Sequence, residues 1–180
     1  VGASSLYGGS WQEGAGAVFA ENQALRWLSD LAGLPESAGG VFVQGGTIGN
    51  LSALVTARED AREKFPDVTK WAIACSAEAH SSIATAAKIM DVELVKIAPR
   101  DDLRIHGDDI AAVIDDYHRT NMGRICAVVA TAGTTNLGVI DDLVGAGKAA
   151  HDRNIWFHVD GAYGLAGLCA PSVRALFIGV

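Results

Sequence analysis

The chain alternates between two hydrophobic periods, one typical of helices and one typical of buried strands. Apolar residues recur every three or four positions through residues 16–33, and Gly33 followed by Pro35 ends this helical pattern. Short continuous apolar runs between the helical stretches indicate buried strands. The pattern predicts helices at residues 16–33, 48–64, 81–90, 108–117 and 141–151, and strands at residues 41–43, 71–75, 92–97, 125–130 and 155–159.

Strands that alternate with helices of about ten or more residues predict a mostly parallel sheet, because parallel neighbours need long crossover connections. Helices should then cover both faces of the sheet. The expected fold class is therefore a three-layer α/β/α arrangement. In such sheets ligands bind beyond the carboxyl ends of the strands. The polar residues that directly follow each predicted strand are the first candidates for a functional site.

Composition narrows the domain organisation and the class of partner. The 180 residues are 49% apolar and 19% charged, enough for one domain with a substantial core, and no linker or repeat divides residues 1–180. The net charge of -7 argues against nucleic acid and anionic membranes as partners, since both require clustered Lys and Arg. Charge or glycine interrupts every apolar run before the ~20 residues of a membrane span. We expect a small-molecule partner.

Cysteine usage and the chain ends suggest where the protein resides. Cys75, Cys126 and Cys169 are widely separated and form no CxxC motif, so the sequence predicts neither a metal site nor a disulfide framework. Such usage is typical of the reducing cytoplasm.

The first residues lack the basic start and apolar centre of a signal peptide, and residue 1 is not methionine. Since the chain also stops on an apolar run, we expect both ends to be cuts in a longer protein.

A glycine-rich turn with a hydroxyl group follows the first predicted strand. Gly45, Gly46 and Thr47 precede a predicted helix, whose free N–H groups and positive dipole end favour an anion. Glycine also lets the backbone approach a ligand closely. The turn is thus a candidate phosphate site, although many α/β units turn through glycine with a threonine cap and bind nothing. It is neither a Walker loop, because no Gly-Lys-Ser or Gly-Lys-Thr follows, nor a GxGxxG dinucleotide motif.

Two more strand ends carry polar candidates. His80 lies where the strand at residues 71–75 leads into the next helix, so it can cap that helix or stack on a planar ligand. Thr134 and Thr135 lie in a hydroxyl-rich turn after the strand at residues 125–130, which turn chemistry alone can also explain. A parallel sheet would bring these turns to the same edge as the glycine-rich turn.

The strand at residues 155–159 ends at Asp160, the most informative candidate. A carboxylate at the end of an apolar strand is costly to desolvate unless a cation or a strong donor meets it. A protonated ring nitrogen of a cofactor is one such partner, and the small residues Gly161 and Ala162 leave room for a flat ring. The alternative is an aspartate that caps its own loop.

Four segments, taken in their order along the chain, resemble the pyridoxal-phosphate-dependent group II decarboxylases, the family of aromatic amino acid, glutamate and related decarboxylases. The segments are VFVQGGTIGN, ACSAEAHSSI, VVATAGTTNLGVIDDL and IWFHVDGAYG, each at the end of a predicted strand. The resemblance extends over most of the chain. It implies part of a large cofactor-binding domain of the aspartate aminotransferase type, known as fold type I, with pyridoxal 5'-phosphate as the cofactor.

The resemblance also implies roles for individual residues. Asp160 would pair with the pyridine nitrogen and keep it protonated, which makes the ring an electron sink. His80 would stack on one face of the ring and Ala162 would pack on the other, so that Asp160 and His80 are the expected catalytic residues. Thr135, rather than Thr134, would lie near the ring, and the glycine-rich turn would hold the phosphate. The expected cofactor-binding residues are Gly45, Gly46, Thr47, His80, Thr135, Asp160 and Ala162.

The implied reaction is decarboxylation of an L-amino acid to the corresponding amine. Decarboxylases of aromatic amino acids, glutamate and diaminobutyrate share these motifs, so the motifs do not select a substrate. The resemblance implies a homodimer, because active sites in this family lie at a dimer interface. Within the fold, the alternatives are an aminotransferase, a cysteine desulfurase or a sphingosine-phosphate-type lyase. Outside it, the alternative is a non-catalytic nucleotide-binding module.

One departure from the family concerns the lysine that carries the cofactor. In the family this lysine lies in a His-Lys motif downstream of the segment around Asp160, and this chain has no lysine after Lys148. The lysines present fall on predicted helices or within strands, where we expect solvated surface charges. They are Lys64, Lys70, Lys88, Lys96 and Lys148. With the small C-terminal domain and an N-terminal segment also expected elsewhere, residues 1–180 should be inactive by themselves.

Overall fold

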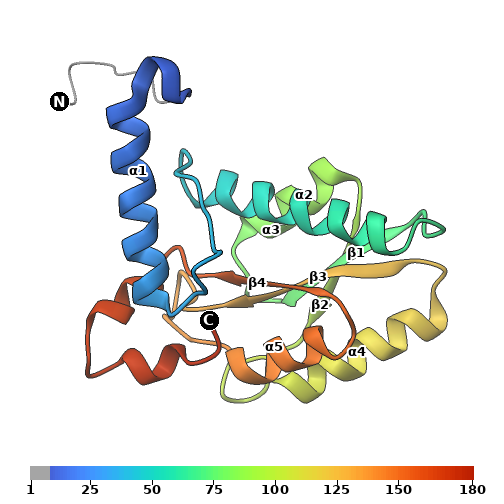
Figure 1. Ribbon diagram of the computed structural model, residues 1–180. Helices are drawn as coiled ribbons and strands as arrows, with labels where there is room; N and C mark the ends of the chain where they lie inside the picture. Colours follow the sequence, from blue (N-terminus) through green and yellow to red (C-terminus); the bar gives the residue numbers. More distant parts are fainter. Residues whose placement is uncertain (1–8) are drawn as a thin grey trace. The chain divides into compact units, whose positions relative to one another are not determined.

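The computed structural model describes residues 9–180 (Figure 1). The chain divides into two compact units, Val1–Val43 and Gln44–Val180. The second unit carries the whole sheet and every strand end that the sequence analysis singled out as polar. Among the described residues, no helix is both long enough and apolar enough to cross a membrane.

The first unit contains the helix α1, Trp11–Ala32. The hydroxyl of Ser10 accepts a hydrogen bond from the Glu13 N–H and so caps the start of the helix. Gly33 ends the helix in the left-handed conformation, with φ 77°. The predicted end of this helix is therefore confirmed, and its start lies before residue 16 because the Ser10 cap adds a turn that the apolar spacing does not reveal.

The predicted strand at residues 41–43 is wrong. Val41 and Phe42 are largely exposed, and the Phe42 N–H donates to a carboxylate oxygen of Glu21 on α1 (3.2 Å) rather than to another strand. A strand persists only where its backbone groups pair with a neighbour. Three apolar residues between turns give the same pattern whether or not such a neighbour exists.

The second unit is built on a four-stranded parallel sheet with the order β2-β1-β3-β4. The strands are β1 Trp71–Ser76, β2 Glu93–Ile97, β3 Arg124–Thr131 and β4 Trp156–Asp160. Each agrees with its prediction to within one residue at either end. The central strands β1 and β3 are buried along nearly their whole length, which explains their continuous apolar sequences.

Helices cover both faces of this sheet, as predicted (Figure 1). One face carries α2 and α3, and the other carries α4 and α5. The helices are α2 Gly46–Lys64, α3 Ser81–Met90, α4 Gly107–Thr120 and α5 Leu143–His151. The short 3-10 helices η2 Leu165–Cys169 and η3 Arg174–Phe177 follow β4.

The core between the sheet and the α2–α3 pair holds the middle of α2 in place. Leu54 and Ala57 of α2 and Ile83 of α3 pack with Ile73 and Val129 of the central strands, and all five are almost fully buried. Burial of one such branched side chain contributes about 1.5–3 kcal/mol. The small alanines let the helices lie close to the sheet. The middle of α2 is therefore anchored against the central strands.

The strand order creates a crevice at the carboxyl edge of the sheet. From β1 the chain passes through α3 to β2 on one side, and from β3 it passes through α5 to β4 on the other side. The connections after β1 and β3 therefore leave toward opposite faces of the sheet. Ligands of open α/β sheets bind at such a point. The predicted site residues His80, Thr135, Asp160 and Ala162 lie at or just after the ends of β1, β3 and β4, so they surround this crevice, while Gly45, Gly46 and Thr47 lie at the start of α2.

The packing of α4 against β3 depends on a neutral histidine. His118 Nε2 accepts a hydrogen bond from the Ile125 N–H (3.1 Å). Burial, aided by the nearby charge of Arg124, lowers the pKa of His118 below its ordinary value of 6.5. The unfolded chain therefore takes up this proton more readily than the folded protein. The free energy of unfolding should consequently fall as the pH drops below about 6.5.

We expect His118→Gln to flatten this pH dependence between about pH 7.5 and 5.5, since glutamine offers an acceptor oxygen that does not titrate. Urea denaturation of the full-length protein at several pH values measures the effect. His151→Gln is the matched control, because His151 is an exposed histidine at the end of α5 and should leave the dependence unchanged. Equal pH dependence in His118→Gln and the parental protein would contradict this role of His118.

Candidate functional site

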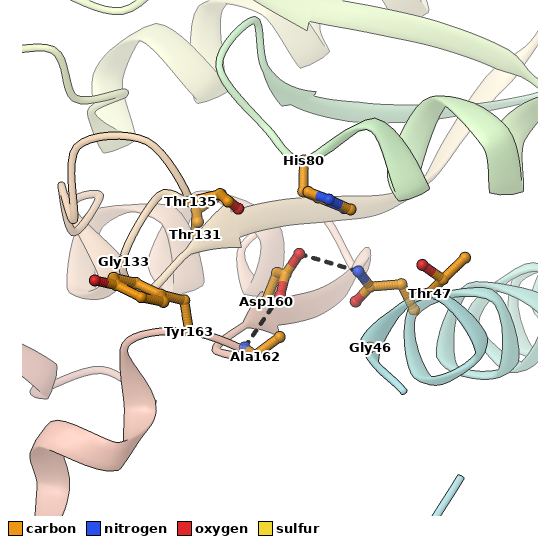
Figure 2. Close-up of a pocket in the computed structure, with 10 residues that line it drawn as sticks. Gly46, Thr47, His80, Thr131, Gly133, Thr135, Asp160, Ala162 and Tyr163 are labelled. Atoms are coloured by element: carbon orange, nitrogen blue, oxygen red, sulfur yellow. Dashed lines mark hydrogen bonds between the residues drawn. The ribbon is translucent and has the colours of Figure 1, made fainter. Parts of the chain in front are cut away.

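The carboxyl ends of the strands and the start of α2 enclose a pocket of about 230 Å³ (Figure 2). Its walls come from the first turns of α2 and from the connections after β1, β3 and β4. The lining residues are Gly46, Thr47, Asn50, His80, Thr131, Gly133, Thr135, Asp160, Ala162 and Tyr163. The structure thus brings together every residue predicted to bind the cofactor except Gly45, which forms the turn and lies outside the lining.

The start of α2 presents unpaired N–H groups at this pocket. Gly45 is the N-cap residue with φ 100°, a conformation that glycine adopts without strain, and no side chain caps the helix. The first turn holds no acidic residue, and within the described part of the chain no hydrogen bond occupies the N–H groups of Gly46 and Thr47. These donors and the positive end of the helix dipole can therefore bind an anion such as a phosphate.

Asp160 is a buried carboxylate without a cationic partner. It ends β4 and is only 7% exposed. Its Oδ2 accepts a hydrogen bond from Asn50 Nδ2 (3.0 Å) and its Oδ1 accepts one from the Ala162 N–H (3.2 Å), the two dashed lines of Figure 2. None of the ion pairs among residues 9–180 includes Asp160. Neutral donors orient this carboxylate but do not balance its charge, so the site favours a cationic ligand group.

His80 is both a helix cap and part of the pocket wall. Its Nδ1 accepts hydrogen bonds from the N–H (3.2 Å) and the hydroxyl (2.9 Å) of Ser82, which caps α3. Because Nδ1 accepts, the ring proton is assigned to Nε2. The ring is exposed on the side of the pocket, where Figure 2 shows it near Asp160. The two interpretations that the sequence left open for His80 are therefore compatible.

The loop after β3 contributes hydroxyl groups with different surroundings. Thr134 Oγ1 accepts a hydrogen bond from the Val139 N–H (3.1 Å), so it closes the loop and does not line the pocket. Thr135 lines the pocket and is exposed there, which favours Thr135 over Thr134 as a ligand contact. Thr131 also lines the pocket, and its buried Oγ1 has no hydrogen-bond partner in the described structure. Such a hydroxyl is costly to bury, which is typical of a group that meets a ligand.

Small residues let the backbone segments around the pocket approach closely. A Cβ added at Gly46 would lie 3.1 Å from the Cβ of Ala162. At Gly133, where φ is 104°, an added Cβ would lie 2.8 Å from the Cα of Gly164. The largely exposed ring of Tyr163 lines the pocket beside these contacts. Larger residues at either glycine would therefore push apart the segments that define the pocket.

Sequence reasoning missed four lining residues: Asn50, Thr131, Gly133 and Tyr163. The clearest omission is Asn50, which belongs to the buried side of α2 together with Leu54 and Ala57. A polar residue at helical spacing from apolar ones was the available signal, because a buried amide needs hydrogen-bond partners. Thr131 gave no comparable signal, since a threonine at a strand end is common and its missing partner is visible only in three dimensions.

Comparison with known proteins identifies the family of this chain. Residues 7–180 match the pyridoxal-dependent decarboxylase conserved domain. The chain belongs to this decarboxylase family. It is 32% identical over 174 residues to an aromatic-L-amino-acid decarboxylase of Bacillus atrophaeus, an alignment that covers 95% of this chain and 36% of that protein. It is 41% identical over 160 residues to an L-2,4-diaminobutyrate decarboxylase of Rhizobium meliloti, covering 86% and 31%. The chain thus spans about a third of the length of these decarboxylases.

Solved structures confirm the fold class of this decarboxylase segment. The glutamate decarboxylase domain of a diaminobutyrate-pyruvate transaminase and L-2,4-diaminobutyrate decarboxylase from Vibrio parahaemolyticus superimposes with a TM-score of 0.89 at 28% identity, over 96% of this chain and 40% of that one. The 4-hydroxyphenylacetaldehyde synthase of Rhodiola rosea gives a TM-score of 0.90 at 26% identity, over 99% and 41%. The parallel sheet between helix layers is therefore the α/β fold of fold-type-I enzymes.

The pocket of this decarboxylase segment fits pyridoxal phosphate, the cofactor of the family. The start of α2 offers donors for the phosphate, and Asp160 offers an unbalanced carboxylate for a protonated ring nitrogen. The small residues Gly46 and Ala162 form one side of the pocket and leave room for a flat ring. Residues 9–180 contain no cluster of three His, Cys, Asp or Glu side chains placed to hold a metal ion.

Proposed function

We propose that the protein containing this chain is a pyridoxal-phosphate-dependent decarboxylase that converts an L-amino acid to carbon dioxide and the corresponding amine. The observation that carries the proposal is the buried Asp160 carboxylate, which faces no cation in the described structure and shares a pocket with unpaired helix N–H groups. A ligand with a protonated pyridine and a phosphate complements both features. Membership of the decarboxylase family supports the same reaction.

Each wall of the pocket would serve one part of this chemistry. Bound pyridoxal phosphate supplies a conjugated ring that takes up the electron pair left on Cα when carbon dioxide leaves. Asp160 would hold a proton on the ring nitrogen. His80 and Ala162 would flank the two faces of the ring and keep its plane fixed relative to the bond that breaks. The N–H groups of Gly46 and Thr47 would bind the phosphate, with Thr135 near the ring.

The reaction can be tested with the full-length protein, pyridoxal phosphate and a panel of aromatic, acidic and basic L-amino acids. Release of carbon dioxide with an equal amount of amine supports the proposal. Amino-group transfer without carbon dioxide would indicate an aminotransferase instead. An aldehyde product would place the protein nearer to its relative from Rhodiola rosea, a 4-hydroxyphenylacetaldehyde synthase. A protein that shows no cofactor absorbance would be a non-catalytic module.

Gly46→Val is expected to weaken cofactor binding much more than folding. The valine Cβ would lie 3.1 Å from the Cβ of Ala162, and its methyl groups would crowd the N–H donors at the start of α2. We expect the Kd for pyridoxal phosphate to rise about 50-fold, since charge-assisted phosphate contacts are lost. Titration measures the Kd, and urea denaturation checks the fold.

The control for this variant is Gly39→Val, because an added Cβ at Gly39 has no neighbour within 4 Å. Its Kd should equal that of the parental protein. If Gly46→Val also binds the cofactor with the parental Kd, the phosphate is held elsewhere.

The proposal also includes the cellular location and the oligomeric state of the protein. Cys75 and Cys126 are free thiols in the core, where burial raises the pKa of each to about 11, and Cys169 is free and exposed. Free thiols favour a cytoplasmic location. A homodimer follows from the resemblance to group II decarboxylases, whose active sites lie at a dimer interface.

A further inference from the structure

A network of hydrogen bonds under the pocket converges on the side chain of Asn50. Asn50 is 6% exposed and lies one turn into α2. Its Nδ2 donates to Asp160 Oδ2 (3.0 Å) and to Ser82 Oγ (2.9 Å), and its Oδ1 lies 2.8 Å from His158 Nε2. Ser82 Oγ in turn contacts His80 Nδ1 at 2.9 Å. One amide from α2 therefore connects the ends of β1 and β4, where the two expected catalytic residues lie.

Each bond in this network has a fixed direction. The carboxylate of Asp160 can only accept, so the two hydrogens of the Asn50 amide nitrogen point to Asp160 and Ser82. The Ser82 hydroxyl, which accepts from Asn50, donates its own hydrogen to Nδ1 of His80. Rotating the amide by half a turn would place its oxygen 3.0 Å from the carboxylate and leave two acceptors unpaired. Asn50 therefore has a single favourable orientation.

A hydrogen bond from His158 holds the Asn50 amide in this orientation. His158 lies on β4, two residues before Asp160 and on the same face of the strand. Burial lowers the pKa of His158 despite the nearby charge of Asp160, so the ring is neutral at physiological pH. Its Nε2–H donates to Asn50 Oδ1. The histidine consequently fixes the amide without supplying the cation that Asp160 lacks.

We propose that Asn50 is a positioning residue that orients the Asp160 carboxylate and the His80 ring together against the cofactor. This inference rests on the proposed function. Asn50 acts on Asp160 by a direct bond and on His80 through Ser82. Loss of the amide would leave the Asp160 Oδ2 and the Ser82 hydroxyl without their shared donor. The Asp160 carboxylate and the His80 ring would then lose the orientation that the cofactor ring requires.

The test uses the full-length protein loaded with pyridoxal phosphate that carries 15N at the ring nitrogen. Asn50→Leu keeps a similar volume and removes every polar group of the side chain. We expect its 15N signal to move toward that of an unprotonated ring, and kcat to fall on the order of tenfold or more with KM changed far less. Asn50→Ser, which is smaller and retains a polar group, should show the same direction if Asn50→Leu does not fold. An unchanged 15N signal in the folded variant would overturn the proposal.

A second variant separates the two branches of the network. Ser82→Ala removes the hydroxyl bond to His80 Nδ1, leaves the bond from the residue 82 N–H to the same nitrogen, and keeps the bond between Asn50 and Asp160. We expect it to alter the circular dichroism of the bound cofactor, which reports on the stacked ring, and to leave the 15N signal in place. Ser52→Leu is the matched control for Asn50→Leu, because it is an exposed polar-to-leucine change on α2, and it should alter neither signal. If Ser82→Ala and Asn50→Leu have identical effects on both signals, the proposed division is wrong.

Failure of this inference can be distinguished from failure of the proposed function. A parental protein that binds the cofactor but releases no carbon dioxide would overturn the decarboxylase function alone, because the 15N signal still reports on Asn50. A parental protein that decarboxylates and whose Asn50→Leu variant matches it in kcat and 15N signal would overturn the positioning role alone. A parental protein that binds no pyridoxal phosphate would overturn both.

Discussion

Replacing Asp160 with asparagine is expected to slow decarboxylation by the full-length enzyme about a thousand-fold or more while leaving the cofactor bound. A neutral amide cannot hold a proton on the ring nitrogen, so the ring becomes a poor electron acceptor. The amide also has only one oxygen, whereas the two carboxylate oxygens accept from Asn50 and Ala162. Carbon dioxide release in a single turnover measures the loss.

Cofactor absorbance in the same samples shows that the Asp160→Asn enzyme remains loaded. Asp101→Asn is a suitable control, because Asp101 is an exposed aspartate far along the chain from the pocket residues and should leave turnover unchanged. An Asp160→Asn enzyme with parental turnover would remove Asp160 from the catalytic role.

Covalent attachment of the cofactor is expected at a lysine outside these 180 residues. None of the lysines in the described structure lines the pocket. Lys64 is instead held by Asp60 of the same helix at 2.7 Å, and Lys148 by Asp152 at the C-cap of its helix at 2.6 Å. Borohydride reduction of the full-length protein with pyridoxal phosphate, followed by peptide mapping, should yield one modified lysine that belongs to none of the segments described here.

Two further experiments bear on this expectation. Replacing each of the five lysines by arginine should leave cofactor incorporation unchanged, and the isolated 180-residue segment should show no stoichiometric labelling. If one of these five lysines is labelled and the isolated segment releases carbon dioxide from an amino acid, the segment is itself a complete enzyme.

Hydrophobic periodicity was sufficient to predict the sheet because β1 and β3 are buried on both faces, which leaves a continuous apolar run bounded by polar turns. The same rule failed at residues 41–43. There the apolar run has no strand partner, and pairing is a property of the neighbour rather than of the run itself. The carboxyl ends of α1 and α2 were predicted to within one residue because Gly33 and Pro35 follow α1 and Pro66 follows α2.

The candidate site was predictable at residues whose type and neighbours in the sequence already indicate a ligand. Asp160 could be singled out because a carboxylate after an apolar strand is costly to desolvate. The glycine-rich turn before α2 was a candidate because a free helix start favours an anion, although many such turns bind nothing. Asn50 offered only the weak signal of a polar residue at helical spacing from apolar ones, and Thr131 offered none. Their significance lies in partners that are distant in sequence or missing altogether, such as the bond between Asn50 and Asp160 across 110 positions.

In the part of the chain that the structure describes, no side chain caps the first turn of α2, so the stability of the folded protein should depend on the supply of cofactor. The N–H groups of Gly46 and Thr47 have no hydrogen-bond partner among the described residues, and an anion can bind them only in the folded state. Binding of the cofactor phosphate there therefore raises the free energy of unfolding by mass action. When pyridoxal phosphate is scarce, more molecules would fray around Gly46 and become substrates for cellular proteases. The amount of enzyme in the cell, and not only its rate, should then rise and fall with cofactor supply.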